Sequence, residues 1–143
     1  VCDKGFEEEA ILRLSRVGFD NCLGYLDGGI NSWISHNSFD VIESISADDL
    51  SKTIESISLI DVRKTGERSN GYLLNSKHIT LDSFQDDLTK IDIKNKHYIH
   101  CAGGYRSMIA CSILKRNGYS AVVDVKGGFS SIRNSNFKII NNE

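Results

Sequence analysis

Cysteine, glycine and arginine lie close together in the stretch His100–Ser107, which reads HCAGGYRS. Cys101 follows a strand-like run and precedes a segment with the apolar periodicity of a helix. A cysteine in that position lies beside the free N–H groups and the positive dipole end of the helix, and both favour negative charge. At helix N-termini the thiol pKa falls to roughly 3.5–7.5, so we expect a Cys101 thiolate near neutral pH.

The residues after Cys101 are those that an anion-binding loop needs. Gly103 and Gly104 can adopt left-handed backbone angles that curl a loop around an anion, and Arg106 adds a fixed cationic fork. The stretch therefore predicts covalent catalysis by a thiolate nucleophile held in an anion cradle. The alternative is a buried cysteine that only packs, which is the commoner role of a single cysteine after a strand.

The loop CAGGYRS resembles the active-site loop of the rhodanese (sulfurtransferase) family, in which a cysteine carries a transferable sulfur as a persulfide. Rhodanese-like phosphatases place one residue more between cysteine and arginine, and their wider ring fits phosphate. Four residues separate Cys101 from Arg106 here, so the resemblance implies sulfur transfer. Two alternatives stay open: a cysteine-based phosphatase or arsenate reductase, and a docking module that keeps the fold without turnover.

The resemblance also implies a role for each residue of the loop. Cys101 would accept and donate the sulfur, Arg106 would hold the loop and orient an anionic donor, and Ser107 would cap the helix or bond to the sulfur. Backbone N–H groups would stabilise the thiolate or persulfide; they belong to Ala102, Gly103, Gly104, Tyr105 and Arg106.

Two further segments bear on the site. Asp61-Val62-Arg63 resembles the DVR signature of rhodaneses, and we expect Asp61 and Arg63 to form a structural ion pair. His100 lies within a strand, so its side chain should point away from that of Cys101. We expect His100 to be a core residue, and no Cys–His dyad can be deduced from the sequence.

The elements that position these residues alternate between strand and helix. Strands are predicted at 41–45, 58–62, 97–100 and 121–125, and helices at 46–56, 81–88, 107–117 and from 127 onward, with an apolar tail at 137–140 covering the sheet. Residues 66–72 are predicted as a loop or broken helix. This order indicates an α/β fold with a mostly parallel central sheet, which the resemblance makes a rhodanese-like three-layer sandwich. Cys101 then lies at the carboxyl end of a central strand, where α/β proteins bind ligands.

Residues 1–40 resemble the site-bearing half of the rest of the chain. The aligned pairs are Cys2 with Cys101, Gly5 with Gly104, Glu7 with Arg106, Gly18-Phe19 with Gly118-Tyr119, and Gly28-Gly29 with Gly127-Gly128. A helix over 7–17, a strand over 21–26 and a helix from 28 with Trp33 in a core are predicted. Glu7 replaces the arginine, so we expect no chemistry there. We interpret 1–40 as the C-terminal half of a degenerate, inactive rhodanese-like repeat and 41–143 as a complete rhodanese-like domain; two unrelated units of similar pattern are the alternative.

Composition excludes several classes of partner. The chain of 143 residues has a formal net charge of −2, so there is no basic excess for nucleic acid. No apolar run approaches the ~20 residues of a membrane span, and we expect no membrane partner. The four cysteines, at positions 2, 22, 101 and 111, lack metal-ligand spacing, and no HxHxDH-type motif occurs. We expect no metal and no cofactor, and because Cys101 must stay reduced, a cytoplasmic location.

The run HCAGGYRSMIACSILKRNGY, residues 100–119, is similar to the C-terminal rhodanese of proteins that fuse a metallo-β-lactamase-like persulfide dioxygenase domain to two rhodanese repeats. The resemblance implies such an N-terminal domain in a longer parent protein, of which this chain, beginning at Val1, would be a piece. The implied partners are small molecules: thiosulfate or a low-molecular-weight persulfide as donor, and a thiophilic acceptor. The sequence leaves open whether the chain forms a homo-oligomer.

Overall fold

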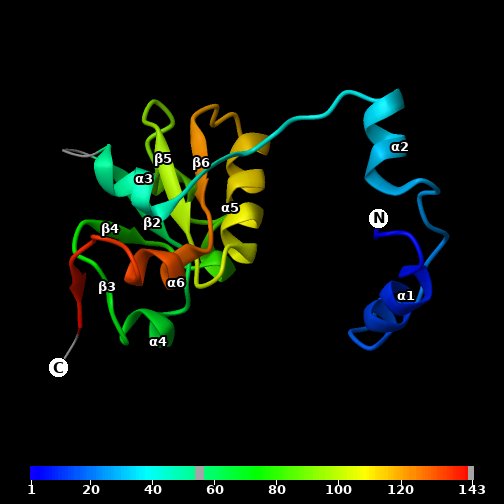
Figure 1. Ribbon diagram of the computed structural model, residues 1–143, viewed down its shortest axis with the longest axis horizontal. Coiled ribbons are helices and arrows are strands. Elements are labelled where there is room, and N and C mark those ends of the chain that lie inside the picture. Colours follow the sequence, from blue (N-terminus) through cyan, green and yellow to red (C-terminus); the bar gives the residue numbers. More distant parts are fainter. Residues whose placement is uncertain (54–56, 142–143) are drawn as a thin grey trace. The chain divides into compact units, whose positions relative to one another are not determined.

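The computed structural model describes residues 1–53 and 57–141 (Figure 1). The chain divides into two compact units, Val1–Val41 and Ile42–Glu143, one residue beyond the boundary expected after residue 40. Each unit is described by itself, as unit 1 and unit 2.

Unit 2 is built on a parallel sheet. Its strands are β1 (Glu43–Ile45), β2 (Ser58–Asp61), β4 (Ser76–His78), β5 (His97–His100) and β6 (Val122–Val125). They are ordered β1-β6-β5-β2-β4, and every neighbouring pair is parallel. The predicted α/β class with a mostly parallel sheet is therefore confirmed, and β5, which precedes Cys101, is the central strand.

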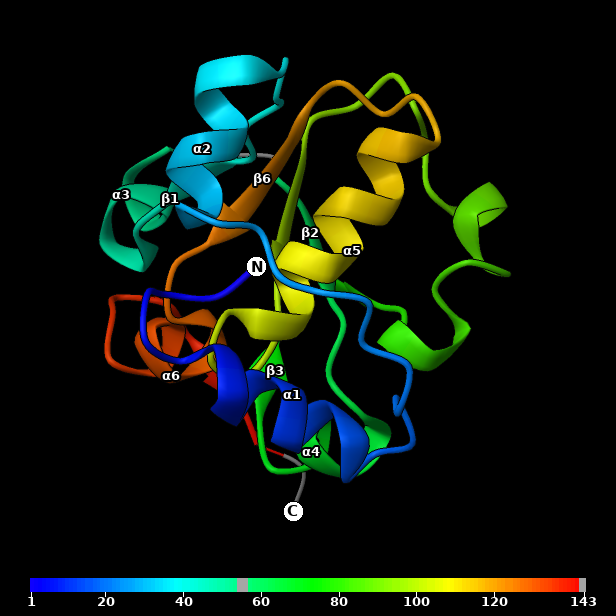
Figure 2. The ribbon, with the colours of Figure 1, turned by 90° about the vertical axis from the view of Figure 1, so that its right-hand side faces the viewer.

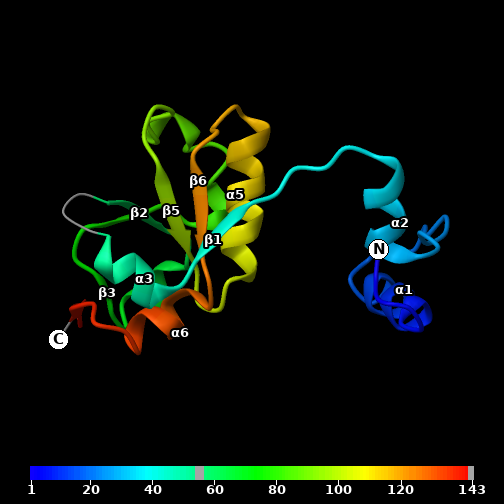
Figure 3. The ribbon, with the colours of Figure 1, turned by 45° about the horizontal axis from the view of Figure 1, so that its top comes forward.

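Helices cover both faces of this sheet (Figures 1 and 3). α5 (Tyr105–Arg116) lies on one face, and α3 (Ala47–Lys52) and α6 (Gly128–Arg133) lie on the other. Figure 2 looks from the α5 side, with α5 in front of the strands. Because side chains alternate along a strand, Ile99 packs with Leu114 in one apolar cluster, while a second cluster fills the other face. The sheet and its two helical layers form the expected three-layer sandwich.

α3 begins as its sequence predicts. The Ser46 hydroxyl accepts a hydrogen bond from the Asp49 backbone N–H at 3.1 Å, which caps the first turn. Leu50 is fully buried. The helix was predicted to extend to residue 56 with Ile54 inward, but it ends at Lys52, and residues 54–56 lie outside the described residues.

One predicted element of unit 2 was wrong, and another has an additional role. Instead of a helix over 81–88 there are two short 3₁₀ helices, η1 (Leu81–Ser83) and η2 (Leu88–Lys90). The Ser83 hydroxyl bonds to the Asp87 carboxylate, and such local polar contacts compete with helical bonding. The tail at 137–140 packs Phe137 and Ile139 against the second apolar cluster, as expected, and its β7 (Ile139–Ile140) also pairs antiparallel with β3 (Tyr72–Leu73).

Unit 1 contains α1 (Glu7–Ser15) and α2 (Gly29–His36). The strand predicted at 21–26 is absent from the described residues of this unit, because a strand needs a neighbour to accept its hydrogen bonds. Trp33, expected in a core, is 46% exposed. α1 ends at Ser15, two residues before the predicted end, and Gly18 follows with a left-handed φ of +89°.

Candidate functional site

Cys101 lies directly after the central strand β5 and is buried, with 2% of its surface exposed. The segment from Ala102 to Gly104 then turns into α5. The helix begins at Tyr105, two residues before the expected start, and Gly104 at φ +105° is its N-cap. The loop thus brings the thiol to the positive end of a twelve-residue helix.

The sulfur of Cys101 is bound by the loop itself. The Gly104 N–H donates to Sγ at 3.1 Å, and the Ser107 hydroxyl oxygen lies 3.6 Å from Sγ. Burial alone would raise the pKa of this thiol. Hydrogen bonds from the Ser107 hydroxyl and from the N–H groups of Ser107, Gly104 and Gly103 outweigh burial, so the pKa is lowered from its ordinary value. The arrangement favours a thiolate.

Ser107 does not cap α5, since Gly104 holds that position. Its hydroxyl also lies 3.0 Å from the Gly104 carbonyl oxygen, so its single proton can be donated to that oxygen or, when the thiol is ionised, to the sulfur. Asp124 of β6 is buried close by, and burial raises its pKa against the opposing effects of Ser107 and Lys126. Asp124 was not expected near the site, because the residues around it have the pattern of an ordinary buried strand.

Arg106 is held by a residue that the sequence analysis also did not identify. Its two terminal nitrogens donate to the Glu67 carboxylate at 2.6 and 2.7 Å, in a bidentate ion pair. Glu67 belongs to α4 (Thr65–Arg68), within the segment expected to be a loop or broken helix. The hydrogen bonds from Arg106 lower the pKa of Glu67 to about 2. We call this pair the Glu67–Arg106 clamp.

Asp61 and Arg63 form an ion pair at 2.8 Å, with both side chains buried. Arg68 adds a second contact to Asp61 at 3.0 Å. Burial would raise the pKa of Asp61, but the hydrogen bond from Arg63 and nearby positive charge lower it. Arg63 also lies 3.7 Å above the ring of Phe129 and donates to the Gly71 carbonyl. These contacts shape the segment that carries Glu67.

His100 is fully buried and its ring stacks on that of Phe129. Its Nδ1 contacts the backbone of Cys101 and not its thiol, at 3.3 Å from the carbonyl oxygen. Burial lowers the pKa of His100 to about 4, so the ring is neutral at pH 7. Among the described residues its Nε2 has no hydrogen-bond partner. His100 therefore supports the backbone behind Cys101 and is not placed as its base.

The start of α6 holds the loop from behind. The Phe129 N–H donates to the Cys101 carbonyl at 2.7 Å, and the Ser130 N–H donates to the Ala102 carbonyl at 3.1 Å. This approach requires Gly128, because a Cβ there would lie 2.4 Å from the Cys101 oxygen. We call these contacts the α6 clasp. They direct the two carbonyls toward the first turn of α6.

Residues 46–135 match the family model of the rhodanese-like domain. The chain belongs to this family. The rhodanese-like fold is also that of a rhodanese-like domain protein from Staphylococcus aureus, with a TM-score of 0.65 and 30% identity over 71% of this chain and 100% of that one.

Two relatives of this rhodanese-like chain have names that refer to sulfur transfer. The putative sulfurtransferase YtwF of Bacillus subtilis is 34% identical over 91 residues, which are 61% of this chain and 86% of the relative. The thiosulfate sulfurtransferase GlpE of Stutzerimonas stutzeri is 27% identical over 77 residues, which are 54% of this chain and 71% of that relative.

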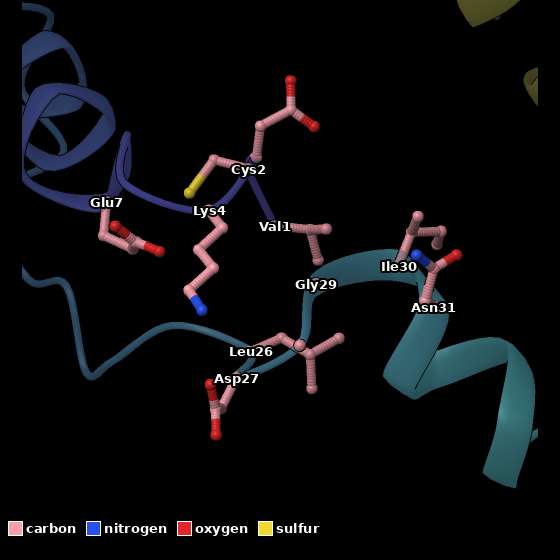
Figure 4. A pocket seen from close by; sticks show the side chains of 11 residues that line it. Val1, Cys2, Lys4, Glu7, Leu26, Asp27, Gly29, Ile30 and Asn31 are labelled. Carbon is pink, nitrogen blue, oxygen red and sulfur yellow. The ribbon is translucent and has the colours of Figure 1, made fainter.

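Outside the rhodanese-like match, unit 1 has a pocket beside Cys2, Lys4 and Glu7 (Figure 4). The Gly5 N–H donates to the Glu7 carboxylate at 2.9 Å, whereas the N–H of the aligned Gly104 donates to a sulfur. The next glycine pairs also correspond. Gly28 and Gly29 have φ of +75° and +59°, against +71° and +55° at Gly127 and Gly128.

Among residues 1–53 and 57–141, no group of three or more potential metal ligands occurs. Within the same residues, no helix has both the length and the apolar character needed to pass through a bilayer.

Proposed function

We propose that this protein is a sulfurtransferase that moves a sulfane sulfur through a Cys101 persulfide. The donor is thiosulfate or a low-molecular-weight persulfide, and the acceptor is a thiophilic nucleophile. The observation that carries the proposal is the hydrogen bonding of Cys101 Sγ by the Gly104 N–H beside the Ser107 hydroxyl, which lowers the thiol pKa. The names of the relatives support the reaction type.

In the first half-reaction the Cys101 thiolate attacks the outer sulfur of the donor. A new S–S bond forms to Cys101, the donor's own bond to that sulfur breaks, and sulfite or a thiolate leaves with the electron pair. The terminal sulfur of the persulfide then carries the negative charge. The N–H groups at the start of α5 stabilise this charge without having to reorganise.

In the second half-reaction the acceptor attacks the terminal sulfur. The persulfide bond breaks and Cys101 leaves as a thiolate, which the same hydrogen bonds from Gly104 and Ser107 stabilise. A low thiol pKa makes Cys101 a good leaving group as well as a nucleophile present at neutral pH. Two separate half-reactions through a covalent intermediate lead us to expect ping-pong kinetics.

The test is mass spectrometry of the protein after treatment with thiosulfate or glutathione persulfide. We expect the Cys101 peptide to gain one sulfur atom and to lose it after cyanide is added. A Cys101 peptide that never gains sulfur would instead support a docking module that has the fold without turnover.

We further propose that unit 1 is a degenerate copy of the site-bearing half of unit 2. The support is the aligned glycine pairs with matching left-handed angles and the Gly5 N–H that binds a carboxylate in place of a sulfur. Negative charge from Asp3, Glu7, Glu8 and Glu9 would disfavour both a Cys2 thiolate and an anionic donor. Unit 1 then takes no part in the chemistry.

The resemblance of residues 100–119 to the last rhodanese of persulfide dioxygenase fusions supports a persulfide donor within a longer parent protein. A thiol that must remain reduced supports a reducing compartment, of which the cytoplasm is the proposed one.

A further inference from the structure

The Glu67–Arg106 clamp occupies the one guanidinium in the loop that was expected to meet the donor. Both terminal nitrogens of Arg106 are bound by the carboxylate, at 2.6 and 2.7 Å. The two side chains are 27% and 38% exposed, so the pair lies where a ligand entering from solvent can sense it. A donor that approaches Cys101 thus meets a paired guanidinium and not a free cation.

The carboxylate is fixed in place from its own side as well. Glu67 Oε2 accepts a hydrogen bond from the Lys64 backbone N–H at 3.0 Å, at the start of α4. Arg106 is fixed in the first turn of α5. The clamp therefore joins two rigid helix starts, and an incoming anion would have to displace an anchored carboxylate to gain both nitrogens.

The two arginines nearest to Glu67 in the sequence do not replace the positive charge that Glu67 neutralises on Arg106. Arg63 and Arg68 both pair with Asp61. Arg106 remains in electrostatic reach of the sulfur: after the Glu67 contacts, the charge of a Cys101 thiolate also raises its pKa. A change of charge at Glu67 is therefore felt at Cys101 through Arg106.

From the geometry of the clamp we infer that Glu67 is a specificity-determining residue, which offsets the charge of Arg106 and makes the site favour sulfur donors of low charge over the thiosulfate dianion. The inference rests on the proposed sulfurtransferase function and concerns the same site. Glu67 acts through Arg106 and is a positioning residue, not one that touches the transferred sulfur.

Two donors that differ by one unit of charge give the test. Thiosulfate is a dianion, and methanethiosulfonate is a monoanion in which a methyl group replaces one oxygen; both transfer the same sulfur to the Cys101 thiolate, releasing sulfite and methanesulfinate respectively. The quantity measured is the ratio of kcat/KM for thiosulfate to kcat/KM for methanethiosulfonate, with cyanide as the acceptor. The extra charge of thiosulfate is taken to lie about 6 Å from the Glu67 carboxylate, in a medium with an effective dielectric constant near 40. Removing the carboxylate charge then changes the ratio about tenfold.

We expect Glu67→Gln to raise this ratio about tenfold, and the rise to shrink as salt screens the charges. Glu67→Asp keeps the charge and should leave the ratio near that of the unchanged protein. Asp49→Asn is the matched control, because it removes an exposed carboxylate that pairs with Lys52 in α3, outside the clamp. It should leave both the ratio and the rates unchanged.

The outcomes separate the inference from the proposed function. An unchanged ratio in Glu67→Gln, or an equal fall in both kcat/KM values, would mean that the clamp serves stability alone and would overturn the inference. If Glu67→Gln does not fold, Glu67→Ala removes the same charge and is measured in its place: a raised ratio supports the inference, and an unchanged ratio or an equal loss for both donors overturns it. Failure of the unchanged protein to take sulfur from either donor would overturn the proposed function itself.

Discussion

At the scale of single residues, the two thiols of unit 2 differ in their readiness to ionise although both are buried. Hydrogen bonds lower the pKa of Cys101 despite its burial. Burial and the charge of Asp124 raise the pKa of Cys111 to about 12. Cys111 lies on the buried side of α5, where it packs in the apolar cluster.

Cys101→Ser should abolish sulfur transfer from thiosulfate to cyanide, because a hydroxyl in the same cradle does not ionise at neutral pH. The melting temperature should change little, since the two side chains are close in size. Cys111→Ser is the control and should keep transfer, although it places a hydroxyl in the apolar cluster. If transfer survives Cys101→Ser and is lost in Cys111→Ser, then Cys111 and not Cys101 carries the sulfur.

His100 predicts a pH dependence of stability. Its pKa is about 4 in the folded protein and 6.5 ordinarily, so the unfolded chain takes up the proton first as the pH falls. The sign follows: folding stability is complete above pH 6.5 and is lost as the pH falls toward 4, by at most about 3 kcal/mol at 1.36 kcal/mol per pKa unit.

The measurement is urea unfolding at pH 7 and pH 4.5 for the unchanged protein and for His100→Leu. Asp61 and Glu67, whose pKa values are lowered, also lose stability toward acid in both proteins. The variant should therefore show a smaller fall between the two pH values. Equal falls in the two proteins would contradict the assigned pKa.

At the scale of elements, the α6 clasp requires a glycine that sequence reasoning treated only as the start of a helix. Gly128→Ala would place a Cβ 2.4 Å from the Cys101 carbonyl oxygen at φ +55°. We expect a loss of about 1–3 kcal/mol of unfolding free energy, because the backbone must shift or remain strained. Gly103→Ala is the control, because a Cβ there meets nothing within 4 Å. Its unfolding free energy should change by less than about 0.5 kcal/mol. Similar losses in both variants would show that the close approach is not the cause.

The length of the loop is a second property of the elements. An added glycine between Gly104 and Tyr105 should move the Gly104 N–H away from the sulfur and reduce sulfur transfer about a hundredfold, the cost of one lost oxyanion donor. A glycine added in the turn at Lys94-Asn95 is the control for this insertion.

The unchanged loop should not hydrolyse p-nitrophenyl phosphate, because the three equatorial oxygens of the transferred phosphoryl group each need donors. Robust hydrolysis by the unchanged protein that Cys101→Ser abolishes would overturn the sulfurtransferase proposal.

The sequence was most informative where local pattern and tertiary position agree. The short run before Cys101 was predicted as a strand and is the central strand β5. Ser46 caps α3 because a helix cap depends only on residues that are neighbours in the sequence. Glu67 could not be assigned, because its partner Arg106 lies 39 residues away and only the fold brings them together. Met108 and Ile109 are apolar but about 40% exposed, because α5 buries the face that carries Ser107 and Ala110 instead.

At the scale of the whole molecule, unit 2 holds every residue of the proposed site and the whole of the family match. A chain of residues 42–143 should therefore melt cooperatively and transfer sulfur at a rate within about twofold of the full chain, because unit 1 contributes no side chain to the proposed chemistry. The measurements are calorimetry and the thiosulfate–cyanide assay. Loss of the cooperative transition would mean that residues 1–41 are needed by the core of unit 2, and loss of activity alone would mean that they act in the reaction.

The α6 clasp also has a consequence for the order in which the site is assembled on the ribosome. The sulfur-bearing loop is synthesised before Phe129 and Ser130, whose N–H groups hold its carbonyls, and β1 can pair only after β6 has emerged. Until then the nascent thiol has neither its brace nor its burial, and it is exposed to oxidants as an ordinary cysteine. The reactive thiolate thus appears late in synthesis, when the strands that bury it are already available to pair.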